Sequence, residues 1–193
     1  MDIRFVSKNT SKFNEVETLF QNMNEIKIIH IEENISELQT ENIEKLIRDK
    51  VLKAFKLIGR PLFVDHTCFY IESLGNFPGG LTQLVWDSLQ ADNFSRLFGN
   101  LTNTSVTAQT TIAYCDAKKI YTFEGKIKGK IASQPRGNSE FQWDTIFIPD
   151  NNNLKNQTFA EMGNQRKNEF SMRKIALEKF HFFLQRNIVY EKD

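Results

Sequence analysis

The sequence predicts an α/β fold in which helices flank a mixed β-sheet. Three observations support this class. Short apolar runs alternate with segments of helical periodicity over residues 3–64, the pattern of a β-α-β-α-β unit with parallel pairing. β-Branched runs typical of antiparallel strands follow after residue 106. The chain has 193 residues, 40% of them hydrophobic, which is enough for one domain (1–193), either a single large one or a compact one of two lobes. A parallel part followed by an antiparallel part suggests two lobes with a cleft between them, where ligands usually bind.

The elements of the first part follow from apolar spacing. Two segments carry apolar residues three and four positions apart, as amphipathic helices do, and three short runs are rich in Ile, Phe and Val. Gly59 and Pro61 end the second helix, because neither residue suits a helix interior. We expect strands over Ile3–Val6, Ile26–Ile31 and Leu62–Val64, and helices over Ser11–Asn22 and Thr40–Leu57.

The second part of the chain contains more predicted β-strand than the first. The segment Asp116-Ala117-Lys118 separates two β-branched runs and is a hairpin signal. Pro149 ends a further candidate strand. We expect a helix over Leu81–Phe98, strands over Val106–Tyr114, Lys119–Ala132 and Phe141–Ile148, a polar loop over Asp150–Gln157 and a final helix over Asn168–Leu184.

Charge and cysteine usage exclude several classes of protein. The 25 basic and 24 acidic side chains leave a net charge of +1, which argues against bulk electrostatic binding to nucleic acid or to an anionic membrane. Cys68 and Cys115 stand in no zinc-ligand spacing and are expected to be buried free thiols. No apolar run approaches the ~18 residues of a membrane span, and no secretory signal opens the chain. We therefore expect a cytoplasmic protein.

Two polar segments of the first part are candidate sites. Ser7-Lys8-Asn9-Thr10-Ser11-Lys12 joins a strand to a helix start, where free N–H groups and the helix dipole attract anions. The alternative is that a Ser or Thr merely caps the helix. Glu37 precedes the second helix and is either a solvated acid or a Mg²⁺ ligand, since Mg²⁺ prefers carboxylate oxygen.

A third candidate site is Asp65-His66-Thr67, where the apolar strand Leu62–Val64 is expected to end. Two titratable groups at the end of a buried strand cost free energy unless they are paired, solvated or bound to a ligand. The segment continues into a loop that contains Gly75 and Pro78. A site for a charged ligand is one explanation.

Two segments of the second part suit a flat heterocycle and an anion. Phe141, Trp143 and Asp144 follow a Pro-Arg-Gly loop, and aromatic faces beside polar edges suit a heterocyclic base. The alternative is an inward-facing aromatic pair on a strand. Lys167, Ser171 and Arg173 lie near the expected start of the last helix, where cations oppose the dipole. They mark either an anion site or a solvated basic surface.

Taken in order along the chain, these segments resemble the inosine triphosphate pyrophosphatase family, which acts on non-standard purine nucleoside triphosphates. The family has a Thr-Gly-Asn-x-x-Lys loop, a Glu-Ile-Gln-like segment and an acidic pair before Ser or Thr and a Leu-Gly-Gly-x-Pro-Gly loop. It continues with Pro-Arg-Gly, an aromatic Asp-Pro-x-Phe-x-Pro segment, Thr-x-Ala-Glu-Met, Lys-Asn and Ser-His-Arg. The matching segments here are Ser7–Lys12, Glu37–Gln39, Asp65–Thr67, Leu74–Gly79, Pro135–Gly137, Phe141–Pro149, Thr158–Met162, Lys167–Asn168 and Ser171–Arg173.

The resemblance implies an elongated mixed α/β structure with a nucleotide-binding cleft between its lobes, usually assembled as a homodimer. It implies that water attacks the α-phosphorus of a nucleoside triphosphate and that Mg²⁺ is required. It places the substrate at Ser7, Asn9, Lys12, Thr67, Phe141, Trp143, Asp144, Lys167, Ser171, Met172 and Arg173, the metal at Glu37 and Asp65, and the catalytic groups at Asp65 and His66.

The chain departs from the family pattern at two positions. His66 stands where the family has its second acid, and Met172 stands where it has a purine-reading histidine. Imidazole is a poorer ligand for Mg²⁺ than a carboxylate is and suits Mn²⁺ or other transition metals better, and a thioether cannot donate a hydrogen bond. We hypothesise an active enzyme in which Glu37 and Asp65 retain the metal and His66 activates water or orients a phosphate. The alternative is a nucleotide-binding sensor with weakened catalysis.

Overall fold

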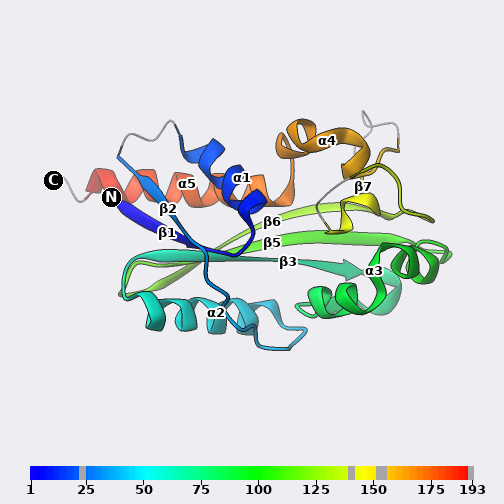
Figure 1. Cartoon of the computed structure of the whole chain (residues 1–193), viewed down its shortest axis with the longest axis horizontal. Helices are drawn as coiled ribbons and strands as arrows, with labels where there is room; N and C mark the ends of the chain where they lie inside the picture. Colours follow the sequence, from blue (N-terminus) through cyan, green and yellow to red (C-terminus); the bar gives the residue numbers. More distant parts are fainter. Residues whose placement is uncertain (22–24, 139–141, 151–155, 191–193) are drawn as a thin grey trace. The chain divides into compact units, whose positions relative to one another are not determined.

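The computed structural model describes residues 1–21, 25–138, 142–150 and 156–190 (Figure 1). The strands are β1 (Asp2–Val6), β2 (Lys27–Ile31), β3 (Leu62–Ile71), β4 (Pro78–Gly79), β5 (Ser105–Cys115), β6 (Ile120–Ile131) and β7 (Phe147–Pro149). The helices are α1 (Thr10–Phe20), α2 (Ile43–Ile58), α3 (Thr82–Phe98), α4 (Phe159–Asn168) and α5 (Met172–Tyr190), with 3₁₀ turns η1 (Glu72–Leu74) and η2 (Gln142–Thr145).

The described strands form one mixed sheet, as the sequence predicts. Its order is β2-β1-β3-β5-β6-β7, with β4 paired to β3. β1 runs parallel to both β2 and β3, whereas the β3–β4 and β6–β7 pairs are antiparallel. In the register of the first pair, Phe5 lies opposite His30.

The chain divides into two compact units, and the long strands β3, β5 and β6 each contribute residues to both. Unit 1 comprises Met1–His66, Thr110–Gly125 and Arg173–Asp193, and unit 2 comprises Thr67–Gln109 and Lys126–Met172. That the 193 residues behave as a single domain with a cleft between lobes stays a prediction.

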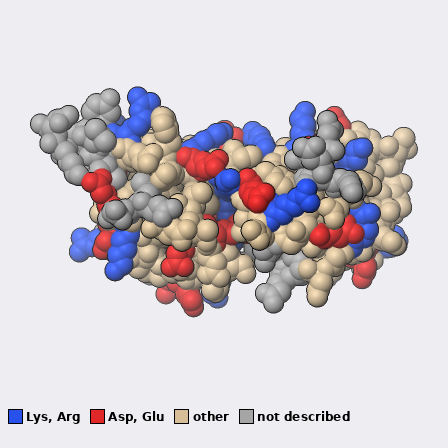
Figure 2. All heavy atoms as spheres, turned by 90° about the horizontal axis from the view of Figure 1, so that it is seen from above, with Lys and Arg blue, Asp and Glu red and all other residues tan. Residues whose placement is uncertain are grey.

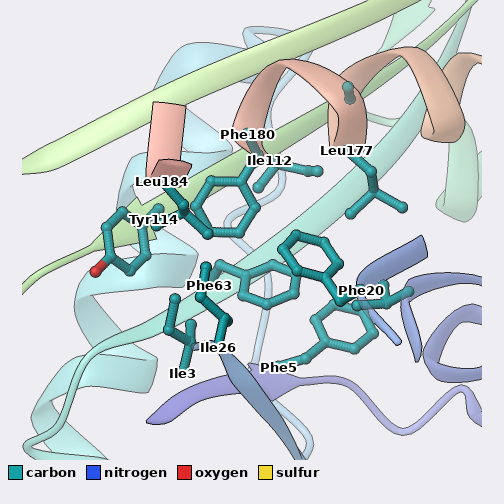
Figure 3. Packing of buried hydrophobic residues seen from close by; sticks show 12 residues of the cluster. Ile3, Phe5, Phe20, Ile26, Phe63, Ile112, Tyr114, Leu177, Phe180 and Leu184 are labelled. Atoms are coloured by element: carbon teal, nitrogen blue, oxygen red, sulfur yellow. The ribbon is translucent and has the colours of Figure 1, made fainter. Parts of the chain in front are cut away.

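Unit 1 is organised around an aromatic core on one face of its strands. Phe5, Phe63 and Phe180 are fully buried there, and their rings pack at centroid distances of 4.7 and 5.0 Å along the series. Figure 3 shows these side chains converging from β1, β3 and α5, with Phe20 of α1 beside them. Helices α1 and α5 cover this face, and α2 covers the opposite face (Figure 1).

Unit 2 has a separate core. Phe69 packs against Trp143 with ring centroids 4.6 Å apart, and Phe147 packs against Phe159 at 4.9 Å. The remaining buried members of this cluster are Ile71, Trp86, Phe94, Val106, Ala108, Ile131, Ile146 and Met172. The many Phe residues are therefore divided between two cores.

Several expected features are confirmed. Gly59 ends α2 in the left-handed conformation (φ 64°), which favours glycine because it has no Cβ. The hairpin signal also holds: Asp116 lies between β5 and β6, and its Oδ1 accepts hydrogen bonds from the backbone N–H groups of Lys118 and Lys119 at 2.7 and 2.6 Å. Cys68 and Cys115 are buried and form no disulfide.

The expected end of the third strand is wrong. β3 does not stop at Val64 but continues through Asp65, His66 and Thr67 to Ile71. The polar residues do not break the strand because Asp65 and His66 are buried in contact with charged partners from other elements. A polar run ends a strand only where nothing in the fold compensates for its burial.

Two assignments near the C-terminal end are also wrong. Where a strand over Phe141–Ile148 was expected, the described part consists of η2 and the short strand β7. A helix that the sequence reading did not assign, α4, lies ahead of the last helix, which begins at Met172. Thr158 and Glu161 form a capping box at the start of α4, a signal that was legible in the sequence. Lys167 therefore lies in the last turn of α4, where the helix dipole favours a cation.

Candidate active site

The Ser7–Lys12 loop, which runs from the end of β1 into the first turn of α1, is closed by hydrogen bonds within itself. Ser7 Oγ accepts from the Asn9 N–H at 3.1 Å, and Asn9 Oδ1 accepts from the Lys12 N–H at 3.0 Å. The alternative that a Ser or Thr caps α1 is wrong, because the N-cap is Asn9. This arrangement holds Lys12 at a set position in the first turn of α1.

The Lys12 ammonium reaches a buried carboxylate of β3. Its Nζ lies 3.0 Å from Asp65 Oδ1, and Arg173 Nε lies 3.2 Å from Asp65 Oδ2. Burial by itself raises the pKa of the Asp65 carboxyl, but Lys12, Arg173 and Lys50 outweigh burial and hold that pKa well below its usual range. Burial lowers the pKa of Lys12, and Asp65 offsets part of that effect. Asp65 is therefore an ionised anchor for two cations.

A second cluster gathers around Glu37. Its Oε1 lies 2.6 Å from Lys50 Nζ and 3.3 Å from His66 Nδ1, and Lys50 also donates to the backbone carbonyl of Asp65 at 2.8 Å. Burial raises the pKa of Glu37, but His66 and Lys50 together lower it to about 2. Glu37 is therefore not a solvated loop acid.

The strand alternation of β3 separates Asp65 from His66. Successive side chains of a strand point to opposite faces. Asp65 accordingly lies toward α1 and α5, with Lys12 and Arg173, whereas His66 lies toward α2, with Glu37 and Lys50. Of these two residues of β3, His66 is thus the one whose side chain contacts Glu37, and Asp65 has both carboxylate oxygens engaged by cations.

The fold adds two residues that the sequence reading missed. Glu15 Oε2 lies 2.7 Å from Arg173 Nη1, and Lys50 joins Glu37 to β3. Glu15 is three positions after Lys12 and so shares its helix face, which was a usable signal. Lys50 lies at helical spacing from Ile47 and Ala54, both buried, and that spacing marked a lysine at the edge of a buried face.

The side chains near Glu37 offer ligands for a divalent cation. Among the described residues, no three His, Cys, Asp or Glu side chains converge as a complete metal site. Mg²⁺ commonly binds through one or two protein ligands together with substrate phosphates and water, so a complete set is not needed. Glu37 supplies a carboxylate, and His66 Nε2 is buried without a hydrogen-bond partner among the described residues. Glu37 Oε1 and His66 Nδ1 lie 3.3 Å apart, close enough for both to ligate one divalent ion, whereas Nε2 lies on the side of the ring away from Glu37.

Unit 2 contains a buried ion pair of its own. Lys167 Nζ lies 2.8 Å from Asp144 Oδ2, and the two side chains are only 2% and 1% exposed. The ammonium also lies 5.8 Å from the centre of the Phe159 ring. Burying both charges is favourable only because they are paired. The pair therefore sets a rigid polar group in an otherwise aromatic environment.

The Pro135-Arg136-Gly137 loop packs on the start of α4. Arg136 O accepts from Thr158 Oγ1 at 3.0 Å, and Arg136 Nε lies 3.5 Å from Glu161 Oε2. Gly137 has φ 78°, and a Cβ there would lie 2.7 Å from the Glu161 backbone nitrogen. Only glycine fits this close approach.

The remaining predicted substrate residues that the structure describes all belong to unit 2. Trp143 and Met172 are buried in the aromatic cluster of unit 2, and Ser171 is also buried in that unit. Thr67 belongs to unit 2 and is half-buried on β3. Phe141 lies outside the described residues. The structure thus brings Lys12, Asp65 and Arg173 together, Glu37 with His66, and Asp144 with Lys167.

The surface does not present a broad field of one charge on the face shown in Figure 2, where basic and acidic side chains are interspersed among neutral ones. This distribution agrees with the near-zero net charge. No helix in the described part of the chain is long and apolar enough to cross a membrane.

Comparison with known proteins supports one family. Residues 3–183 match the model of the Ham1 family. The chain is 33% identical over 183 residues to the dITP/XTP pyrophosphatase of Saccharolobus solfataricus, covering 95% of this chain and 93% of that protein. It is 28% identical to inosine triphosphate pyrophosphatase 2 of Trypanosoma cruzi, covering 94% and 92%.

Solved structures give the same fold. A HAM1 protein from Coxiella burnetii matches with a TM-score of 0.77 at 24% identity, covering 96% of this chain and 99% of that one. The Staphylococcus aureus Ham1 protein matches with a TM-score of 0.76 at 21% identity, covering 97% and 100%. Because the family model and a relative above 30% identity both span nearly all of the sequence, this chain belongs to the Ham1 family.

Proposed function

We propose that the protein is a nucleoside triphosphate pyrophosphatase that hydrolyses non-standard purine nucleoside triphosphates. The names of the relatives support the substrate class. The observation that carries the proposal is the cluster of three cations, Lys12, Lys50 and Arg173, held beside Asp65 and Glu37 in unit 1. Such a cluster suits a polyanionic group whose charge must be neutralised.

In the proposed reaction, a water oxygen attacks the α-phosphorus, and the bond from that phosphorus to the bridging oxygen of the β-phosphate breaks. The products are the nucleoside monophosphate and pyrophosphate. Lys12 and the N–H groups at the start of α1 bind the triphosphate. Asp65 and Glu15 orient Arg173 and Lys12 before substrate arrives, so that these cations need little rearrangement on binding.

A divalent cation fits this proposal. Glu37 and His66 would hold it, and it would supply charge neutralisation of the phosphates and a more acidic coordinated water. Assigning the ion to His66 differs from the sequence hypothesis, which gave it to Glu37 and Asp65. The contact between Glu37 and His66, and the engagement of both Asp65 oxygens by cations, support the change. A mixed oxygen and nitrogen donor pair favours Mn²⁺ over Mg²⁺.

The base-recognising groups are proposed to lie in unit 2. Lys167 and Asp144 offer a donor and an acceptor on a fixed frame, which suits the polar edge of a purine with a 6-oxo group. Met172 lies in the adjoining aromatic cluster and offers no hydrogen-bond donor, so Lys167 carries more of the base discrimination than it would beside a histidine.

The test is pyrophosphate release by the purified protein with Mg²⁺ or Mn²⁺ across standard and non-standard nucleoside triphosphates. We expect turnover on deoxyinosine, inosine or xanthosine triphosphate well above that on ATP or GTP. A Lys12→Met variant, prepared in parallel, should lose most of this turnover and so exclude a contaminating enzyme. Equal turnover on ATP would contradict the substrate class.

A second candidate function is nucleotide binding without turnover. The observation that favours it is His66 at the position of a family carboxylate. Measurable binding of inosine triphosphate with no pyrophosphate release under either metal would select it.

The homodimer implied by the family resemblance is also a proposal, which light scattering of the purified chain tests directly.

A further inference from the structure

We propose that His30 of β2 is a positioning residue that holds the Ser7–Lys12 loop in its anion-binding conformation. The proposal rests on the function proposed above, because it names a further residue of that same site. No motif drew attention to His30 in the sequence. Its ring lies 6.3 Å from that of Phe5, and its Nδ1 lies 3.8 Å from Glu32 Oε1, but its two closest contacts are with Ser7 of the loop and with Phe13 directly after it.

His30 contacts both ends of the loop. At the first end, its Nε2 lies 2.8 Å from the Ser7 carbonyl oxygen. At the second end, its ring stacks on Phe13, the residue directly after Lys12, with centroids 4.4 Å apart and planes inclined by 5°. Since a carbonyl oxygen only accepts, His30 Nε2 must carry the proton and donate.

β2 therefore fixes Ser7 through both of its backbone polar groups. The Ser7 N–H donates to Ile31 O at 3.1 Å, and the Ser7 carbonyl accepts from His30. Ser7 Oγ then accepts from the Asn9 N–H, and Asn9 Oδ1 accepts from the Lys12 N–H. The series ends at the Lys12 ammonium, 3.0 Å from Asp65. His30 is thus the side chain that connects the sheet to this series of hydrogen bonds.

The position of His30 explains why the loop keeps its shape without glycine. Loops that bind phosphate through backbone N–H groups usually depend on glycine to shape the turn. Here Ser7 and Asn9 supply side-chain oxygens, and His30 supplies the donor for the Ser7 carbonyl. Removing that donor frees the Ser7 peptide to rotate, which moves Asn9 and Lys12 away from the triphosphate.

The substitutions separate the hydrogen bond from the ring contact. His30→Phe keeps the stack on Phe13 and removes the donor. His30→Gln restores a donor, because the Gln Nε2 is the same number of bonds from Cα as the His Nε2. His30→Asn is one methylene shorter and does not reach Ser7. His181→Phe is the matched control, since His181 also packs on an aromatic ring, Phe20, at 5.5 Å in the same unit.

Two measurements are made on each variant: steady-state kinetics on the best triphosphate, and the dissociation constant of inorganic tripolyphosphate by calorimetry. We expect His30→Phe and His30→Asn to raise both KM and the dissociation constant about tenfold, with kcat within about twofold. His30→Gln should recover most of the loss, and His181→Phe should match the parent protein. Thermal unfolding of each variant confirms that the chain is folded.

Three results overturn the proposal. Unchanged tripolyphosphate binding in His30→Phe removes any role for the donor. If His30→Gln loses as much affinity for tripolyphosphate as His30→Phe does, the hydrogen bond is not what positions the loop. If His181→Phe loses as much affinity as His30→Phe, the effect is a general one on unit 1. Failure of the proposed function looks different: the parent protein then releases no pyrophosphate, while tripolyphosphate binding still depends on the residue at position 30.

Discussion

Arg173 Nε lies 3.2 Å from Asp65 Oδ2, although these two residues are 108 positions apart in the chain. The same guanidinium reaches Glu15 through Nη1 at 2.7 Å, so one buried cation links β3, α1 and α5. Glu15 and Asp65 raise the pKa of Arg173 against the opposing effect of burial, and the group stays charged at any working pH. This arginine is therefore both a structural link and a site residue.

Arg173→Met should destabilise the protein by about 3 kcal/mol, because it leaves Glu15 and Asp65 with less compensating charge in a buried place. The measurement is urea denaturation followed by circular dichroism. Arg186→Met is the control: Arg186 is exposed on the same helix, over the Phe182 ring, and its loss should cost no more than about 0.5 kcal/mol. Equal stability of the two variants would show that Arg173 is not an important link.

Stability should fall in acid over a predictable window. The pKa of Glu37 is about 2 in the folded protein against an ordinary value of 4.5. A depressed pKa contributes stability above pH 4.5, and this contribution is lost as pH falls through 4.5 toward 2. Urea denaturation is measured at several pH values between 4.5 and 2, in EDTA so that no bound metal contributes. The free energy of unfolding should fall more steeply with decreasing pH in the parent protein than in Glu37→Gln. Parallel curves would mean that Glu37 is not stabilised by Lys50 and His66.

The buried Lys167–Asp144 pair should be strongly coupled. Lys167→Met and Asp144→Leu each remove one side of this buried ion pair, and each should lower the free energy of unfolding by about 3–5 kcal/mol. The double variant should cost clearly less than the sum, because neither charge remains, with a coupling energy of about 1–3 kcal/mol. A double-mutant cycle by denaturation measures this. Additive losses would place the two groups in independent roles.

His66→Asp should change the metal preference of turnover. A carboxylate is a harder ligand than imidazole, so the variant should gain activity with Mg²⁺ relative to Mn²⁺. The measured quantity is the ratio of kcat with the two metals, compared with the parent and with His66→Ala. If all three proteins share one ratio and one kcat, His66 has no catalytic or metal-binding role.

Local patterns in the sequence were sufficient for much of the architecture. α2 followed from its apolar spacing and from Gly59, and the β5–β6 hairpin followed from Asp116, because both depend on neighbours only a few residues away. The ordered series of short motifs was also enough to indicate the family, which residues 3–183 confirm. The capping box of α4 was equally local and was overlooked.

Only the tertiary structure decided how the charged residues are grouped. Asp65 and His66 are adjacent in the sequence, yet strand alternation turns them to opposite faces, where they meet Lys12 and Glu37 from distant segments. Glu15, Lys50 and His30 joined the site for the same reason. A sequence states which side chains can ionise or donate. Their partners, and hence their pKa values and roles, depend on long-range contacts that form only when the chain folds.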